Sequence, residues 1–175
     1  EIVNELKIQK NTKKYKFLID IDKELCYTKK KKGSVSMKKI LLVSHGEVAR
    51  EFGRTVKMFT GEQEWMRAVC LSEEKDMEIF EREIKEVMKD VPAEDYLIAF
   101  SDIPGGTPAN VTLRWMQEYR LSGLFFTGMN LAAILVAVLS EPAEELEEEV
   151  LTQGRMSLQS IFQKENVQDD ETEDI

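Results

Sequence analysis

Residues 40–46 read Ile-Leu-Leu-Val-Ser-His-Gly, a short apolar run that ends in a histidine and a glycine. Four consecutive branched apolar residues predict a strand that is buried on both faces of a sheet. Three more runs of this kind follow along the chain, at residues 68–71, 96–100 and 124–126. Continuous apolar runs are typical of parallel sheets, so we predict four parallel strands.

The segments between these runs have the spacing of amphipathic helices. The side chains expected to face the sheet from the first helix are Val48, Phe52, Val56 and Phe59, and Gly61 is expected to end that helix. The second helix is expected to begin near Ser72 and to end before Pro92. The third is expected to have Thr107 as its N-cap and Pro108 at its first position. This alternation predicts an α/β open sheet, mainly parallel, with helices on both faces. The flavodoxin-like order 2-1-3-4, with or without an added or exchanged edge strand, would make the first and third strands neighbours.

The 175 residues are enough for one domain with its own core, which we place at 37–165. Residues 1–36 carry ten lysines against five acids and are predicted to be a basic extension, and residues 166–175 an acidic tail. Because the net charge is -9, the rest of the chain is strongly acidic. Nucleic-acid binding needs clustered basic residues and is therefore not expected.

Two apolar stretches need separate interpretation. Residues 121–140 contain no charged residue, but Gly123, Gly128 and Asn130 interrupt them, so a buried strand, turn and helix are predicted and not a membrane span. After Pro142 a final helix is expected to pack through five apolar residues: Val150, Leu151, Leu158, Ile161 and Phe162.

The two cysteines, Cys26 and Cys70, form no Cys-x-x-Cys pair, so the sequence predicts neither a redox motif nor a metal site. They are interpreted as reduced thiols in a cytoplasmic protein. No basic start is followed by an apolar segment, so no secretory signal is predicted.

Two polar residues directly follow predicted strands. His45 comes at the end of the first strand and Asp102 at the end of the third. If these strands are neighbours, both side chains lie at the carboxyl edge of the sheet, where ligands bind in open α/β folds. A neutral imidazole is a nucleophile, and a carboxylate that binds one ring nitrogen fixes which nitrogen carries the lone pair. The pair therefore predicts an imidazole nucleophile oriented by Asp102.

Glycine turns near this edge could bind a phosphoryl group. Gly46, Gly105, Gly106 and Thr107 are the candidate phosphate-binding residues, because backbone N–H groups at the start of a helix attract anions. The Thr107 hydroxyl could cap its helix or bind a phosphate oxygen. The spacing matches neither a P-loop nor a dinucleotide fingerprint. A structural histidine beside an ordinary loop is the alternative that the residues alone leave open.

Five blocks in order resemble one family. They are residues 40–46, 61–64, 102–110, 128–131 and 152–155, and the third reads Asp-Ile-Pro-Gly-Gly-Thr-Pro-Ala-Asn. In these blocks the sequence resembles the IIA component of the mannose/fructose/sorbose class of the bacterial phosphoenolpyruvate-dependent sugar phosphotransferase system. The resemblance covers about residues 37–165.

The resemblance implies that His45 is the phosphorylated histidine, Asp102 its hydrogen-bonded partner and Thr107 a neighbour of the phosphate. It implies a phosphotransferase component without a cofactor, which takes phosphate from HPr and passes it to a IIB protein. That protein phosphorylates sugar entering through membrane IIC and IID subunits. A homodimer is implied too, in which a C-terminal edge strand can be exchanged.

Two other functions are consistent with the same fold. The first is a phosphorylation-sensitive module of a regulatory protein, although the chain contains no helix-turn-helix or ATPase motif. The second is a small nucleotide- or flavin-binding protein, which ranks last because no matching glycine pattern is present.

Overall fold

A computed structural model describes residues 37–142 and 144–160. Its elements are β1 (Lys38–His45), α3 (Val48–Thr60), β2 (Met66–Leu71), α4 (Met77–Lys89), β3 (Tyr96–Ser101), α5 (Thr107–Glu118), β4 (Gly123–Thr127), α6 (Leu131–Leu139) and α7 (Leu146–Met156). The predicted extension at 1–36 and acidic tail at 166–175 lie outside the described residues. So does the C-terminal end of the predicted 37–165 domain.

The four strands form one parallel sheet of order β2-β1-β3-β4, which confirms the predicted architecture. Leu41 and Leu42 are both fully buried, although adjacent residues of a strand point to opposite faces. The sheet is therefore covered on both sides. β1 pairs with β3 so that Val43 lies opposite Ser101, and the ends of these two strands are neighbours.

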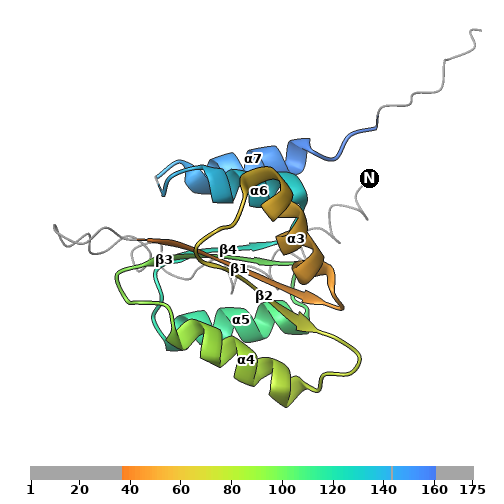
Figure 1. Ribbon diagram of the computed structural model, residues 1–175, viewed down its shortest axis with the longest axis vertical. Coiled ribbons are helices and arrows are strands. Elements are labelled where there is room, and N and C mark those ends of the chain that lie inside the picture. The colour runs from red at the N-terminus through yellow and green to blue at the C-terminus, as the bar shows by residue number, and fades with distance from the viewer. Residues whose placement is uncertain (1–36, 143, 161–175) are drawn as a thin grey trace, which may run out of the picture.

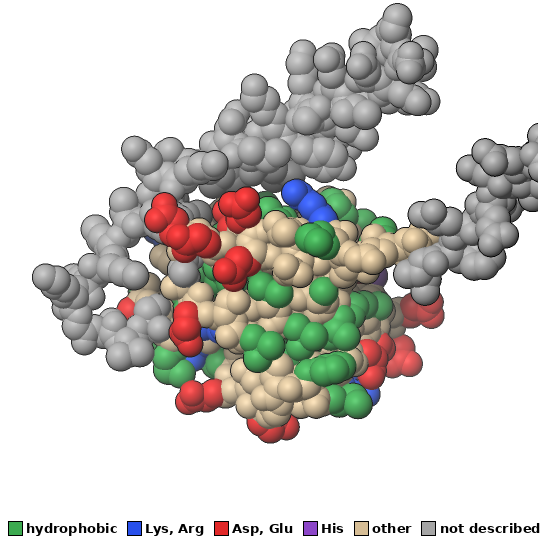
Figure 2. Space-filling view, turned by 90° about the horizontal axis from the view of Figure 1, so that it is seen from above, with side chains coloured by type: hydrophobic (Ala, Val, Ile, Leu, Met, Phe, Trp, Pro, Cys, Tyr) green, Lys and Arg blue, Asp and Glu red, His purple; other side chains and the backbone are tan. Residues whose placement is uncertain are grey.

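Helices α3, α6 and α7 cover one face of the sheet, and α4 and α5 cover the other (Figure 1). The first layer encloses a core around Leu42, Phe100 and Ile134. The second encloses a core around Leu41, Phe80 and Ile84. Acidic side chains gather at one end of the outer surface of the first layer (Figure 2), and three glutamates occupy the first turn of α7. Negative charge at the N-terminus of a helix interacts favourably with the helix dipole.

Two predicted helix starts are wrong. The N-cap of α4 is Asp76, whose carboxylate accepts a hydrogen bond from the N–H of Ile79. The helix therefore begins one full turn later than the predicted start near Ser72. The N-cap of α5 is Gly106, so Thr107 is the first helical residue and Pro108 the second. Ser, Thr and Asp are all good caps, and the loop path decides which residue takes the position.

The first helix faces the sheet through fewer side chains than its spacing predicts. Val56 is fully buried and Phe52 packs against the core, but Val48 is about half exposed and Phe59 is 66% exposed. These two residues lie in the first and last turns of α3. Gly61 ends the helix with a φ of 72°, as predicted for a glycine cap.

The apolar stretch 121–140 forms β4 and α6, as predicted. No helix among residues 37–142 and 144–160 has both the length and the apolar character to cross a membrane. The predicted final helix is α7, and it is anchored by Leu146 and Val150. Leu158 was expected to join this contact, but it follows the helix and is 90% exposed. Ile161 and Phe162 lie outside the described residues.

Candidate functional site

His45 is the last residue of β1 and is held by its neighbours in the chain. The fully buried hydroxyl of Ser44 accepts a hydrogen bond from the N–H of Ala49 (2.8 Å), which ties the end of β1 to the first turn of α3. Gly46 turns the chain with a φ of 53°, and its N–H donates to the carbonyl of Leu71 (2.9 Å) at the end of β2. The histidine therefore sits on a fixed strand end.

Asp102 directly follows β3 and reaches the histidine from the neighbouring strand, as predicted. Its Oδ2 accepts from the backbone N–H of His45 and lies 2.9 Å from Nδ1 of the ring. Its Oδ1 accepts from the N–H of Ile103 (2.8 Å) and, at 3.3 Å, from the hydroxyl of Ser101. Both oxygens are thus bound, and the orientation of the carboxylate is fixed.

The charge of Asp102 determines which ring nitrogen of His45 carries the proton when the ring is neutral. Burial alone would raise the pKa of Asp102, but hydrogen bonds from the backbone and ring of His45 and from the backbone of Ile103 lower it below its ordinary value. The carboxylate is therefore ionised at neutral pH and can only accept hydrogen bonds. Nδ1 of the neutral ring must carry the proton, and Nε2 carries the lone pair. The imidazole side chain is 42% exposed.

The start of α5 lies beside the reactive edge of the ring. A Cβ atom placed on Gly106 would be 2.8 Å from Cε1 and 3.5 Å from Nε2 of His45. Gly106 is the N-cap and has no side chain, so no side chain binds the first N–H groups of the helix. Because Pro108 has no N–H, the groups of Thr107 and Ala109 are the ones that an α-helix leaves without an internal acceptor. They offer donors and a favourable dipole to an anion on Nε2.

The structure brings most of the predicted site residues together, but they contribute differently. His45, Asp102 and Gly106 are in direct contact. The N–H groups of Gly46 and Gly106 already donate to the carbonyls of Leu71 and Ile103, so they are not available to an anion in this arrangement.

Two residues of this region were missed as site residues by sequence reasoning. Ser44 fixes the end of β1, and the side-chain amide of Asn110 donates to the carbonyl of Gly105 (2.9 Å). Their positions within the blocks 40–46 and 102–110 were the only available signal. Among residues 37–142 and 144–160, no group of three or more His, Cys, Asp or Glu side chains could hold a metal ion.

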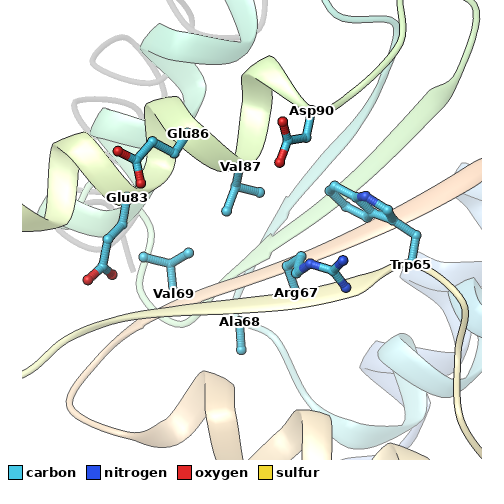
Figure 3. Close-up of a pocket in the computed structure, with 8 residues that line it drawn as sticks. All are labelled: Trp65, Arg67, Ala68, Val69, Glu83, Glu86, Val87 and Asp90. Carbon is cyan, nitrogen blue, oxygen red and sulfur yellow. The ribbon is translucent and has the colours of Figure 1, made fainter.

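A hollow of about 360 Å³ lies away from His45, between the open edge of β2 and α4 (Figure 3). Its lining includes none of the predicted site residues: Trp65, Arg67, Ala68, Val69, Glu83, Glu86, Val87 and Asp90. Three of these are acids, which would repel a phosphoryl group. We assign it no part in the chemistry of His45.

Comparisons with known proteins found a matching family model and similar solved structures. The family model of the phosphotransferase system (PTS) fructose IIA component matches residues 39–153. Among solved structures, the mannose/sorbose specific IIA subunit of Enterococcus faecalis is 26% identical (TM-score 0.63; 74% of this chain, 98% of that one). The PTS IIA protein associated with the fucose utilization operon of Streptococcus pneumoniae is 25% identical (TM-score 0.65; 74% and 96%).

A third structure shares the fold alone. It is a sigma-54 interaction domain protein from Enterococcus faecalis, 13% identical, with a TM-score of 0.57 and coverage of 71% of this chain and 95% of that one. No curated protein matches the chain by sequence.

Proposed function

The chain belongs to the family of the phosphotransferase-system fructose IIA component, and from this premise we propose that it is a phosphocarrier of a sugar phosphotransferase system. In this proposal His45 accepts a phosphoryl group from HPr and passes it to a IIB protein. The IIB protein phosphorylates sugar that enters through membrane IIC and IID subunits. The contact between His45 Nδ1 and Asp102 Oδ2 carries the proposal, because it leaves Nε2 as the nucleophile.

The proposed step forms one bond and breaks one. The lone pair of Nε2 attacks the phosphorus of the phosphohistidine on HPr, and the P–N bond to the donor ring breaks, returning its electron pair to the donor nitrogen. The proton on Nδ1 stays in place. The ring of His45 gains positive charge, which the carboxylate of Asp102 stabilises. In the transfer to IIB, phosphorylated His45 is the donor: a nucleophile on IIB attacks the phosphorus, and the P–N bond to Nε2 breaks.

The phosphoryl oxygens would be bound at the start of α5. The backbone N–H groups of Thr107 and Ala109 are free of intrahelical acceptors, and the hydroxyl of Thr107 lies in the same turn. Gly106 keeps this turn close to the ring. Gly46 and Gly105 then contribute by shaping the turns on either side, since both have positive φ angles.

The surface around His45 suits a protein partner better than a small substrate. The imidazole is accessible, and Val48 and Ile103, which lie in the segments on its two sides, are exposed apolar residues. An accessible nucleophile with apolar neighbours allows two proteins to approach the same atom in turn. We place this reaction in the cytoplasm and expect a homodimer.

The alternative function is a phosphorylation-sensitive regulatory module. The observation behind this alternative is the fold that the chain shares with the sigma-54 interaction domain protein. In that case phosphorylated His45 would be a signal and would not pass its phosphate to a IIB protein.

The decisive experiment is phosphorylation of the chain by phosphoenolpyruvate, Enzyme I and HPr. We expect acid-labile phosphate on the parent chain and none on His45→Ala. An unlabelled parent chain, or equal labelling of the variant, would contradict the proposal. Addition of a IIB protein of the mannose class then separates the two functions, because only a carrier loses its label to IIB.

A further inference from the structure

The imidazole of His45 occupies the space in which a side chain at position 106 would begin. The 2.8 Å between a Cβ at position 106 and Cε1 of the ring is closer than carbon atoms approach in proteins. The ring is therefore bounded on two edges, by Asp102 at Nδ1 and by Gly106 at Cε1. Nε2 is the ring nitrogen that remains available.

The two glycines are required for different reasons. Gly105 has a φ of 72°, which side-chain-bearing residues rarely adopt, and a Cβ there would meet no atom within 4 Å. Gly106 has φ -69° and ψ 166°, an extended conformation that any residue adopts. Glycine at 105 is needed for the path of the chain, whereas glycine at 106 is needed for the space that the imidazole occupies.

Asn110 holds this turn from within the first turns of α5. Its Nδ2 donates to the carbonyl of Gly105 (2.9 Å), and the N–H of Gly106 donates to the carbonyl of Ile103 (3.2 Å). The Asn110 side chain is exposed and makes no core contact that would explain an amide at this position. Its described hydrogen bond is the one to the turn that contacts the ring.

We propose that Asn110 is a positioning residue, which holds the Gly105-Gly106 turn against Cε1 of His45 and so keeps Nε2 aimed at the incoming phosphorus. The inference rests on the phosphocarrier function proposed above. Asn110 acts through the turn and does not contact the reacting atoms. Its loss should therefore slow the transfer step and leave the affinity for the donor protein nearly unchanged.

The test uses the full chain with Asn110→Ala and, as a matched control, Gln117→Ala, which removes an exposed amide from the same helix. With phosphorylated HPr as donor, we expect kcat for the Asn110 variant to fall about tenfold and KM to change less than about twofold, because a small misplacement of the nucleophile slows the reaction itself. The control should match the parent. Circular dichroism reports whether each variant is folded.

A second readout does not depend on any partner. His45 is the only histidine in the chain, so its ring nitrogens give one set of ¹⁵N signals. Asp102 should keep the Nδ1–H form in both proteins, whereas the Cε1–H signal of Asn110→Ala should shift or broaden, because the turn beside Cε1 is released. Folded Asn110→Ala with parent-like kcat and parent-like ring signals would overturn the inference.

Gly106→Ala keeps the test decisive if Asn110→Ala does not fold. The backbone conformation at position 106 accepts alanine, and the added methyl group would collide with the ring of His45. We expect a loss of kcat larger than about tenfold, and a parent-like kcat would contradict the positioning role. If the parent chain accepts no phosphate from HPr, the proposed function fails, and the ring signals of the variants still decide whether the turn positions His45.

Discussion

The Oδ2 atom of Asp102 accepts two hydrogen bonds from the same residue, one from the backbone N–H of His45 and one from its ring Nδ1, both at 2.9 Å. Because the backbone bond joins the ends of β1 and β3, the carboxylate cannot move without disturbing both strand ends. The ends of the two strands therefore fix the ring at its Nδ1 edge.

Asp102→Asn should slow phosphoryl transfer while leaving the fold intact. The amide oxygen can still accept one bond, but the negative charge that stabilises the phosphorylated ring is lost. We expect a decrease of about 10²-fold in the transfer rate from phosphorylated HPr, measured by rapid quench. Circular dichroism should show unchanged secondary structure, and an unchanged rate would remove Asp102 from the mechanism.

The stability of the protein should depend on pH through Asp102. Burial favours the neutral acid, but the hydrogen bonds from His45 and Ile103 outweigh it and lower the pKa of Asp102 below its ordinary value of 3.8. A carboxyl group with a lowered pKa in the folded state stabilises the fold above the unfolded-state value, and this contribution is lost as pH falls through the folded-state pKa.

Urea denaturation of the parent and Asp102→Asn, from neutral pH down to below the ordinary pKa of an aspartate, measures this contribution. The difference between their free energies of unfolding should narrow as the pH falls below 3.8, since the amide of the variant does not titrate. A difference that is independent of pH would show that Asp102 carries no such stabilisation.

The four strands could be predicted because buried parallel strands have a distinct pattern. Ile40 to Val43 form an unbroken apolar run, and both faces of β1 are in fact covered. The meeting of His45 and Asp102 depended on a further condition, that β1 and β3 are neighbours, because parallel neighbours end at one edge of the sheet.

Details that depend on the path of a loop could not be predicted in this way. The cap of α4 is Asp76 and not a residue near Ser72, since either can bind a helix N–H and only the loop geometry selects one. The bond from Asn110 to Gly105 is similar, because an amide five residues from a glycine has many possible partners. The sequence gives the types of these residues and their separation along the chain, but not the distances between them in the folded protein.

Ser44→Ala should destabilise the fold by about 1 kcal/mol, the usual cost of losing a hydroxyl that caps a helix. The buried Ser44 hydroxyl accepts from the N–H of Ala49, whereas the N-cap of α3, Glu47, makes no side-chain cap bond. Urea denaturation measures the change. Ser72→Ala is the matched control and should have almost no effect, because its hydroxyl makes no described hydrogen bond; an equal loss in both variants would contradict the capping role of Ser44.

Asp95→Asn should reduce stability without affecting the chemistry of His45. Asp95 is buried at the amino edge of the sheet, where it accepts from the N–H of Met37 (2.8 Å) and lies 3.4 Å from Nζ of Lys39. The substitution leaves the buried charge of Lys39 without its partner, which we expect to cost about 3 kcal/mol of unfolding free energy. Asp95→Asn combined with Lys39→Met should recover most of this loss, since no unpaired charge remains.

At a temperature where all variants are folded, the transfer rate should equal that of the parent, because β1 separates this pair from His45 by its full length. A slower rate in the stabilised double variant would show that the two edges of the sheet are coupled.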